Sequence, residues 1–586
     1  MKRFLITLLA VIAGGIILSI LPIFFMLAVI VASSGQSNTI VMPNSILAYD
    51  LSTAVSDIKT ETIDFSSVMS NNTSNSISLR QLLNNIKKAS SDNNIKGIVL
   101  RNNTASANFA DMEEIRKALI EFKESGKFIY YMGSSMSMSS MYLASVADGI
   151  YVAPEGMVEI YGVSSLNAFY KNALDYLGVD MQVIRHGKFK SAVEPYVQTS
   201  MSDASRLQMQ RIVDGIWEQV RNEIATARGI EESLIDNFVD EMLFVDSQSA
   251  VDAGLIDSLM YNDQFIDMIR LKMGLNSEDN LNFVEVTSYT DAKTEQAKAA
   301  FAENKVAVVY AMGEIAEGTN KSDQQNIYAA DLIENIQNAS NDNSVKAIVL
   351  RVSSPGGSAL ASDLIWREIE CAKEKKPVVV SMGEYAASGG YYISCGANYI
   401  FAQPNTLTGS IGVFGLIPCT KKLTDNIGIT FDGVSSNKSS AVTIVTPLTD
   451  KQRQYLTKMV EKTYDTFTKR CADGRGTTQT AIDSIGQGRV WLGKDALNMG
   501  LVDELGGIED AIEKAKQLAN VSVCEVVEYP KTLDMMERIM MKMKDSNGSF
   551  AVELLLGDDY VKYERLKRQV SEPSIKAIME YGITIR

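Results

Sequence analysis

The chain of 586 residues contains an internal repeat, and this feature limits its possible folds more than any other. Residues 95–101 (IKGIVLR) match residues 345–351 (VKAIVLR) at an offset of 250 positions. Residues 250–257 (AVDAGLID) match residues 496–503 (ALNMGLVD), so the offset changes by only four positions. Because both motifs recur in the same order at nearly the same spacing, the sequence predicts two copies of one domain in tandem.

Each copy alternates short apolar runs with amphipathic segments, a pattern that predicts an α/β domain around a mainly parallel sheet. Directly after the Gly356-Gly357 pair, apolar side chains recur at helical spacing: Ala361, Leu364, Ile365, Ile369 and Ala372. A strand that turns into a helix in this way exposes backbone N–H groups that can face an anion. The expected division is a first domain at 45–290, a second at 300–530 and a C-terminal tail at 531–586.

The N-terminal segment is long and apolar. Lys2 and Arg3 precede residues 4–32, which contain no charged side chain. About 20 apolar residues suffice to cross a bilayer, whereas a cleaved secretory signal has an apolar core of roughly 7 to 15 residues. An uncleaved transmembrane anchor at 1–34 is therefore favoured. The positive-inside rule then keeps Lys2 and Arg3 on the cytoplasmic side and predicts a single-pass membrane protein whose residues after Ser34 lie on the extracytoplasmic side.

Charge and composition exclude several classes of function. The net charge of −15 and the pI near 4.9 disfavour nucleic acid as a partner, because binding to phosphates requires clustered Lys and Arg. His186 is the only histidine, and the five cysteines are widely spaced, so the sequence predicts no metal site and no cofactor. A Ser/His/Asp triad would have to recruit His186.

The two copies differ at a serine. Ser410 lies in the motif TGSIG at 408–412, whereas Ile160 occupies the corresponding position of the first copy. Residues 355–357 (PGG) are likewise replaced by residues 105–107 (ASA). Any reaction that uses the Ser410 hydroxyl is therefore confined to the second copy.

The first copy contributes a lysine-containing segment, 185–196 (RHGKFKSAVEPY). Burial against apolar and small residues disfavours the ammonium form, and lowering the pKa of a lysine from about 10.4 to about 7.5 requires roughly 4 kcal/mol. A neutral amine can accept the proton of a serine hydroxyl, as in Ser/Lys catalysis, which needs no histidine. On spacing alone, however, Lys190 would be a solvated surface lysine, as Lys188 is expected to be.

Five motifs occur in a fixed order along the duplicated chain: KSAVEP at 190–195, SPGG at 354–357, ASGGYY at 387–392, LTGSIG at 407–412 and GRVW at 488–491. In these motifs the sequence resembles the long, tandem-repeat form of the signal peptide peptidase A (protease IV) family. The resemblance implies two tandem Clp protease/crotonase-like α/β domains after one transmembrane helix, with Ser410 as nucleophile and Lys190 as general base. It also implies a bowl-shaped homotetramer.

The activity that this resemblance implies is that of a membrane-anchored serine endopeptidase with a Ser/Lys dyad. Its substrates would be signal peptide remnants and other apolar peptides. Backbone N–H groups of Gly356 or Gly357, together with that of Ser410, are the candidate donors to the oxyanion, because glycine lets the backbone approach closely.

Alternatives remain open for the base and for the function. Lys438 lies 250 positions after Lys188, where shorter single-copy relatives carry their base, so Ser410/Lys438 is the rival dyad. Ser388, in the ASGG motif, is expected to pack beside the site. The alternative functions are a non-catalytic, membrane-tethered peptide-binding scaffold and an acyl-CoA enzyme of the crotonase group, which would give no reason for a Ser/Lys pair.

Overall fold

The computed structural model describes residues 41–58, 76–289, 303–319, 326–437, 442–531 and 575–579. The anchor predicted at 1–34 and most of the tail predicted at 531–586 lie outside these ranges. Within them, none of the helices combines the length and the apolar character that a membrane crossing requires.

The first repeat is built on a parallel sheet with the strand order β10-β7-β5-β4-β1-β11. Its central strands are continuous apolar runs, as expected for a parallel sheet that is covered on both faces. The strands are β1 (Ser45–Asp50), β4 (Ile95–Arg101), β5 (Phe128–Gly133), β7 (Gly149–Val152), β10 (Ser258–Leu259) and β11 (Asn282–Glu285).

The second repeat has a sheet with the equivalent order, β22-β18-β17-β15-β12-β23, and this confirms the predicted duplication. Its strands are β12 (Lys305–Met312), β15 (Val345–Ser354), β17 (Val378–Ala387), β18 (Tyr399–Ala402), β22 (Glu504–Leu505) and β23 (Glu525–Tyr529). The end of β17 also pairs with β19 (Leu407–Gly409), and β19 pairs antiparallel with β21 (Val490–Leu492). In the first repeat the pairing equivalent to β17–β19 forms a separate two-stranded sheet, and among the described residues that sheet has no third strand equivalent to β21.

Helices of the two repeats also correspond. The helices of the first repeat are α3 (Leu79–Ser91), α4 (Phe109–Lys123), α5 (Met138–Ala144), α6 (Lys171–Leu177), α7 (Glu194–Val197), α8 (Asp203–Arg228), α9 (Glu232–Asp240), α10 (Ser247–Asp252), α11 (Asn262–Lys272) and α12 (Val286–Tyr289). Those of the second are α13 (Ala329–Asn341), α14 (Ala359–Lys373), α15 (Gly389–Ser394), α16 (Lys421–Asn426), α17 (Asp450–Arg475), α18 (Gln479–Ile485), α19 (Gly493–Asn498) and α20 (Ile508–Leu518).

The helix predicted after the paired glycines is present as α14. Its first turn is capped by Ser358, whose side chain accepts from the N–H of Ala361 at 3.3 Å. The predicted apolar face is buried except at Leu364, which is 48% exposed. Leu364 therefore lies at the margin of this face.

A third sheet joins the two repeats, with the order β14-β13-β16-β24-β20-β9. Its strands are β9 (Asp180–His186), β13 (Ile315–Ala316), β14 (Ile327–Tyr328), β16 (Gly356–Ser358), β20 (Val413–Cys419) and β24 (Ile575–Ile578). β9 of the first repeat pairs antiparallel with β20 of the second, so that His186 lies opposite Val413. This pairing brings the lysine-containing segment that follows β9 into the second repeat.

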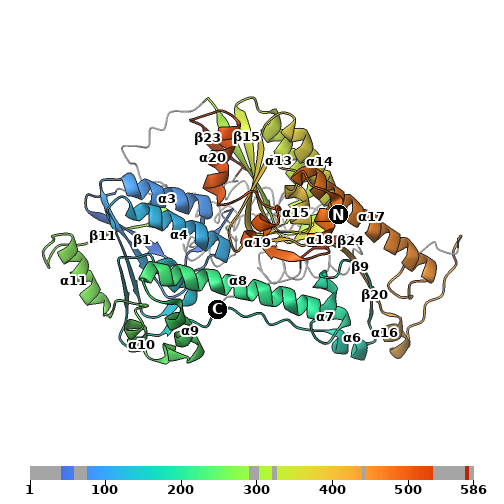
Figure 1. The fold of residues 1–586 in the computed structure, drawn as a ribbon, viewed down its shortest axis with the longest axis horizontal. Coiled ribbons are helices and arrows are strands. Elements are labelled where there is room, and N and C mark those ends of the chain that lie inside the picture. The colour runs from blue at the N-terminus through green and yellow to red at the C-terminus, as the bar shows by residue number, and fades with distance from the viewer. Residues whose placement is uncertain are drawn as a thin grey trace, which may run out of the picture.

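The long helix α8 crosses between the repeats. It contacts α5 in the first repeat and β21 in the second, and Figure 1 shows it running (green) from beneath α4 to α7. The side chain of Gln208 accepts from the N–H of Val490 at 2.8 Å. The smaller pairings are β2 (Ala54–Ser56) with β3 (Ser76–Ser78), and β6 (Met136–Ser137) with β8 (Val158–Glu159).

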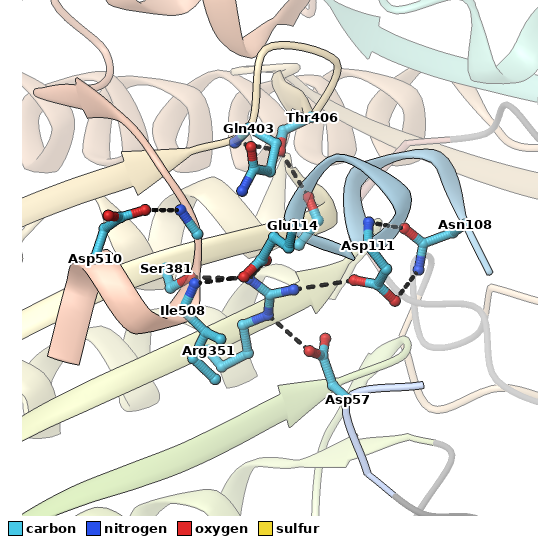
Figure 2. Close-up of polar contacts among 12 residues, drawn as sticks. Asp57, Asn108, Asp111, Glu114, Arg351, Ser381, Gln403, Thr406, Ile508 and Asp510 are labelled. Carbon is cyan, nitrogen blue, oxygen red and sulfur yellow. Dashed lines mark hydrogen bonds and ion pairs between the residues drawn. The ribbon is translucent and has the colours of Figure 1, made fainter. Parts of the chain in front are cut away.

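A buried ion network also connects the repeats (Figure 2). Arg351, on β15, is fully buried and contacts three carboxylates of the first repeat: Asp57 at 2.8 Å, Asp111 at 3.1 Å and Glu114 at 2.8 Å. Its guanidinium also donates to Ser381 Oγ at 2.9 Å. The equivalent arginine of the first repeat, Arg101, has a side chain that is 40% exposed, so the network belongs to the junction alone.

Candidate active site

Lys190 reaches the second repeat through a short segment after β9. The N–H of Phe189 donates to the carbonyl oxygen of Gln487 at 2.9 Å. Gln487 is held in turn by Tyr464, whose hydroxyl accepts from the N–H of Gln487 at 3.2 Å. Burial raises the pKa of Tyr464, which donates to Asp483.

Lys190 itself is 1% exposed, whereas Lys188 is exposed to solvent as predicted.

Two glycines make room for the side chain of Lys190. A Cβ atom on Gly488 would lie 2.6 Å from the Cβ of Lys190, and one on Gly412 would lie 3.2 Å from its Cδ. Gly488 also has a φ of +81°, which glycine adopts without strain. One glycine from each of the LTGSIG and GRVW motifs therefore packs directly against the side chain of Lys190.

Ser410 directly follows the last residue of β19. It is 2% exposed and has a φ of +50°, a conformation that a residue with a Cβ adopts only under constraint. Its N–H donates to the carbonyl oxygen of Arg489 at 2.7 Å. Backbone strain of this kind, of order 1–3 kcal/mol, is concentrated at functional sites.

The amine of Lys190 and the hydroxyl of Ser410 are in contact. Nζ lies 3.0 Å from Ser410 Oγ and 3.3 Å from the carbonyl oxygen of the same residue. Both distances are close to those of ordinary hydrogen bonds. Residues that are 220 positions apart, one from each repeat, thus meet in a buried site.

Ser388 makes a third contact with the amine. Its Oγ lies 2.8 Å from Lys190 Nζ, which is closer than the packing position expected from the sequence. Ser388 precedes α15 with a φ of +56° and a ψ of −112°, and its N–H donates to the carbonyl oxygen of Gly409 at 2.8 Å. A serine followed by two glycines, between a buried strand and a helix, is the sequence signal for such a strained turn.

The Gly356-Gly357 pair lies next to this serine. A Cβ atom on Gly356 would come within 2.6 Å of the backbone nitrogen of Gly389, so the two glycines are in close contact. The N–H of Gly356 donates to Ser354 Oγ at 3.2 Å. The sequence predicts that the N–H of Ser410 helps to bind the oxyanion. In the structure this N–H donates instead to the carbonyl oxygen of Arg489.

The other candidate residues lie elsewhere. The ring of His186 stacks on that of Tyr464, with centroids 4.0 Å apart. Glu194 is buried, and its Oε1 lies 3.7 Å from Arg185 Nη1, as expected for pairing with a neighbouring cation. Lys438 lies outside the described residues. In the part of the chain that the structure describes, no group of three or more His, Cys, Asp or Glu residues could hold a metal ion.

Comparison with known proteins agrees with the duplicated architecture. A family model described as peptidase family S49 matches residues 121–276 and 370–522, one span in each repeat and together more than half of the chain. Protease 4 of Haemophilus influenzae is 34% identical over 502 residues, which cover 83% of this chain and 81% of that protein. Protease 4 of Salmonella typhi is 36% identical over 478 residues, which cover 80% of this chain and 76% of that protein.

Among solved structures, a 1510-N membrane-bound stomatin-specific protease matches 40% of this chain and all of its own, with 20% identity and a TM-score of 0.26. The family model and the two relatives define the class of this protein, a serine protease with two α/β repeats. The chain belongs to peptidase family S49.

Proposed function

We propose that this protein is a membrane-anchored endopeptidase in which Ser410 is the nucleophile and Lys190 is the general base. The observation that carries the proposal is the 3.0 Å contact between Lys190 Nζ and Ser410 Oγ in a buried site. Burial favours the uncharged amine, the form that can accept a proton.

The three oxygen contacts of Lys190 fit a neutral amine. Such an amine has two N–H groups, which can donate to Ser388 Oγ and to the carbonyl oxygen of Ser410. Its lone pair is then directed at the hydroxyl of Ser410. As Oγ attacks the peptide carbonyl, its proton moves to Nζ, and the resulting ammonium group protonates the departing amine. Water then hydrolyses the acyl-enzyme with the same lysine as base.

Gly356 and Gly357 remain the proposed oxyanion donors. Gly356 lies against Gly389, the residue that follows Ser388, and Gly357 is the next residue along β16. The N–H of Gly356 now donates to a hydroxyl group, which an oxyanion, as a stronger acceptor, would displace. The loss of one such donor typically costs on the order of 10² to 10³ in rate.

Signal peptide remnants and other apolar peptides are the proposed substrates, and no cofactor takes part in the proposed reaction. Two relatives are called Protease 4, and a third, 29% identical over half of this chain, is named as a signal peptide peptidase.

We propose that residues 1–34 anchor the protein in the inner membrane, that its catalytic part lies outside the cytoplasm, and that it forms a homotetramer. The uncharged segment at 4–32 supports the anchor. A non-catalytic scaffold is not retained, because the family is one of peptidases.

Alanine substitutions test the dyad. With an apolar fluorogenic peptide, Ser410→Ala and Lys190→Ala should each reduce kcat by at least about 10³-fold, because neither half of the dyad acts without the other. A serine-directed acylating probe should label the wild-type chain and fail to label either variant. Lys188→Ala is the matched control, since this lysine is exposed.

Lys438→Ala separates the two candidate bases. Under the proposal this variant keeps wild-type activity. If Lys438→Ala is inactive and Lys190→Ala is active, the general base is Lys438 and not Lys190. If Ser410→Ala is active, Ser410 is not the nucleophile.

A further inference from the structure

Arg489, in the GRVW motif, is connected to both halves of the site. Its guanidinium carbon lies over two aromatic rings, 5.0 Å from the centroid of Phe189 and 4.1 Å from that of Trp491. Its carbonyl oxygen accepts from the N–H of Ser410 at 2.7 Å. Because Phe189 directly precedes Lys190, one arginine contacts the neighbour of the lysine and the backbone of the serine.

The two rings are the main partners of the Arg489 side chain among the residues that the structure describes. Within that part of the chain, its Nε atom is buried and has no hydrogen-bond partner. Burial lowers the pKa of Arg489, and the carboxylate that most favours its charge, Asp495, is itself paired with Arg211 at 2.7 Å. Since arginine stacks favourably on aromatic faces, contact with the rings is the interaction that holds this guanidinium.

The segment that carries Lys190 is attached to the second repeat by its backbone and by the ring of Phe189. The backbone attachment is the hydrogen bond from the N–H of Phe189 to the carbonyl oxygen of Gln487, at 2.9 Å. Lys188 Nζ also lies 5.6 Å from the centroid of the Phe189 ring, but Lys188 is exposed, and a cation–π contact is weaker in water. Arg489 is therefore the cation that contributes more to holding the ring.

We infer that Arg489 is a positioning residue, whose guanidinium holds Phe189 beside β21 and thereby fixes where Lys190 Nζ lies relative to the serine oxygens. The inference rests on the proposed function of the Ser410/Lys190 site. Nζ is 3.0 Å from Ser410 Oγ and 2.8 Å from Ser388 Oγ, distances that a small movement of the segment would lengthen. A displacement of about 1 Å can cost an enzyme about 100-fold in rate.

Substitution of Arg489 in the full-length chain tests this inference. Arg489→Met removes the cation and keeps an apolar side chain, so kcat for the apolar reporter should fall about 10- to 100-fold, with KM changed by less than about twofold. Arg489→Lys keeps the charge without the flat guanidinium, and its kcat should lie between those of the wild type and Arg489→Met. This partial rescue would show that the cation itself matters.

Arg470→Met is the matched control. The guanidinium of Arg470 also lies over a tryptophan, 3.8 Å from the centroid of Trp366, and its Nε is likewise buried without a partner among the described residues. Trp366 belongs to α14, however, and is not adjacent to Lys190 in the chain. Arg470→Met should lower Tm about as much as Arg489→Met does and should leave kcat unchanged.

A double substitution tests whether Arg489 acts through Phe189. Phe189→Leu removes the other partner of the contact and should lower kcat about as much as Arg489→Met. The chain with both substitutions should be no more than about threefold slower than either single variant, because residues that act through one shared contact are not additive. If Arg489→Met does not fold, Arg489→Lys and Phe189→Leu provide the same comparison.

Amide hydrogen exchange makes the test independent of catalysis. In a fragment that contains residues 187–191, exchange of the N–H of Phe189 should be at least about tenfold faster in Arg489→Met than in the wild type, and unchanged in Arg470→Met. If no chain cleaves peptides but this difference is found, the proposed function fails and the role of Arg489 in holding the segment stands.

Other results would overturn the inference. One is a wild-type kcat in Arg489→Met. Another is an equal loss of kcat in Arg489→Met and Arg470→Met, which would make the effect one of stability alone. A third is multiplication of the two single losses in the double variant, and a fourth is unchanged exchange at Phe189.

Discussion

At the scale of single residues, the site depends on how the amine of Lys190 is aimed. Its contact with Ser388 Oγ, at 2.8 Å, is the shortest of its three contacts with serine oxygens. Ser388 is fully buried and is not itself proposed to react. We therefore treat it as a positioning residue, which holds one N–H group so that the lone pair faces Ser410.

Ser388→Ala should lower kcat by about 10- to 100-fold with little change in KM, because the base is misdirected while the peptide still binds. The loss of an acceptor also disfavours the ammonium form, so the acid limb of the pH–rate profile should move to lower pH. Ser394→Ala is the control, since Ser394 is an equally buried serine in α15 that donates to the carbonyl oxygen of Gly390. Equal losses in both variants, with no change in the pH profile, would leave Ser388 a purely structural role.

The space around Lys190 gives a second prediction. Gly488→Ala places a Cβ 2.6 Å from that of Lys190, so the lysine must shift and kcat should fall at least about tenfold. Gly476→Ala is matched, because Gly476 also has a positive φ, +61°, but has no atom within 4 Å of the added Cβ. Both variants should lose about 1 kcal/mol of stability from backbone strain, as measured by urea denaturation. Activity lost equally in both would contradict the packing explanation.

Only part of the site could be predicted from the sequence. The difference between the repeats singled out Ser410, but the choice of Lys190 over Lys188 came from the family resemblance, since local spacing made both surface lysines. The contact between Ser388 and Lys190 joins positions 198 apart, so no local pattern encodes it. The engagement of the Ser410 N–H by Arg489 likewise depends on the pairing of β19 with β21.

At the scale of elements, the Arg351 network fixes β15 against α4. Burial raises the pKa of Asp57 and Glu114, although the charge of Arg351 opposes the shift. For Asp111, burial and then the charge of Asp57 hold the pKa well above its usual range. Since these folded-state pKa values exceed the unfolded values of about 3.9 to 4.3, the folded chain binds more protons, and this contribution to stability is lost as pH rises through the folded-state values.

Arg351→Met should lower the free energy of unfolding by about 3–5 kcal/mol at pH 7, because three buried carboxylates lose their cation. The loss should be smaller at pH 5, where the raised pKa values allow the carboxyl groups to become neutral. Guanidinium denaturation at both pH values measures the difference. Arg101→Met, at the half-exposed equivalent in the first repeat, should cost less than about 1 kcal/mol, and an equal cost in the two variants would refute the role of burial.

The strands and helices of each repeat could be predicted because their signals are local. The apolar runs at 95–101 and 345–351 became β4 and the start of β15, and the spacing of 361–372 became α14. The third sheet could not be predicted in the same way. Four of its six strands have only two to four residues. The pairing of the longer strands β9 and β20 depends on tertiary contacts across both repeats rather than on any alternation within them.

At the scale of the whole molecule, the proposed anchor makes a separate prediction. Full-length protein should sediment with membranes, and a chain that begins at residue 35 should remain in the supernatant, because residues 4–32 carry no charge to resist burial in lipid. A protease added from outside to spheroplasts should digest a C-terminal tag on the full-length chain. Recovery of the full-length chain in the supernatant, or protection of the tag, would contradict the anchor or its orientation.

Under the proposed dyad, the division of Lys190 and Ser410 between the repeats determines when activity arises during synthesis of the chain. The ribosome completes the lysine-bearing half well before it reaches position 410, so an emerging chain holds an amine without a hydroxyl to activate. Under the proposed mechanism, cleavage begins only after the second repeat has folded and docked, so a chain that ends before position 410 is inactive.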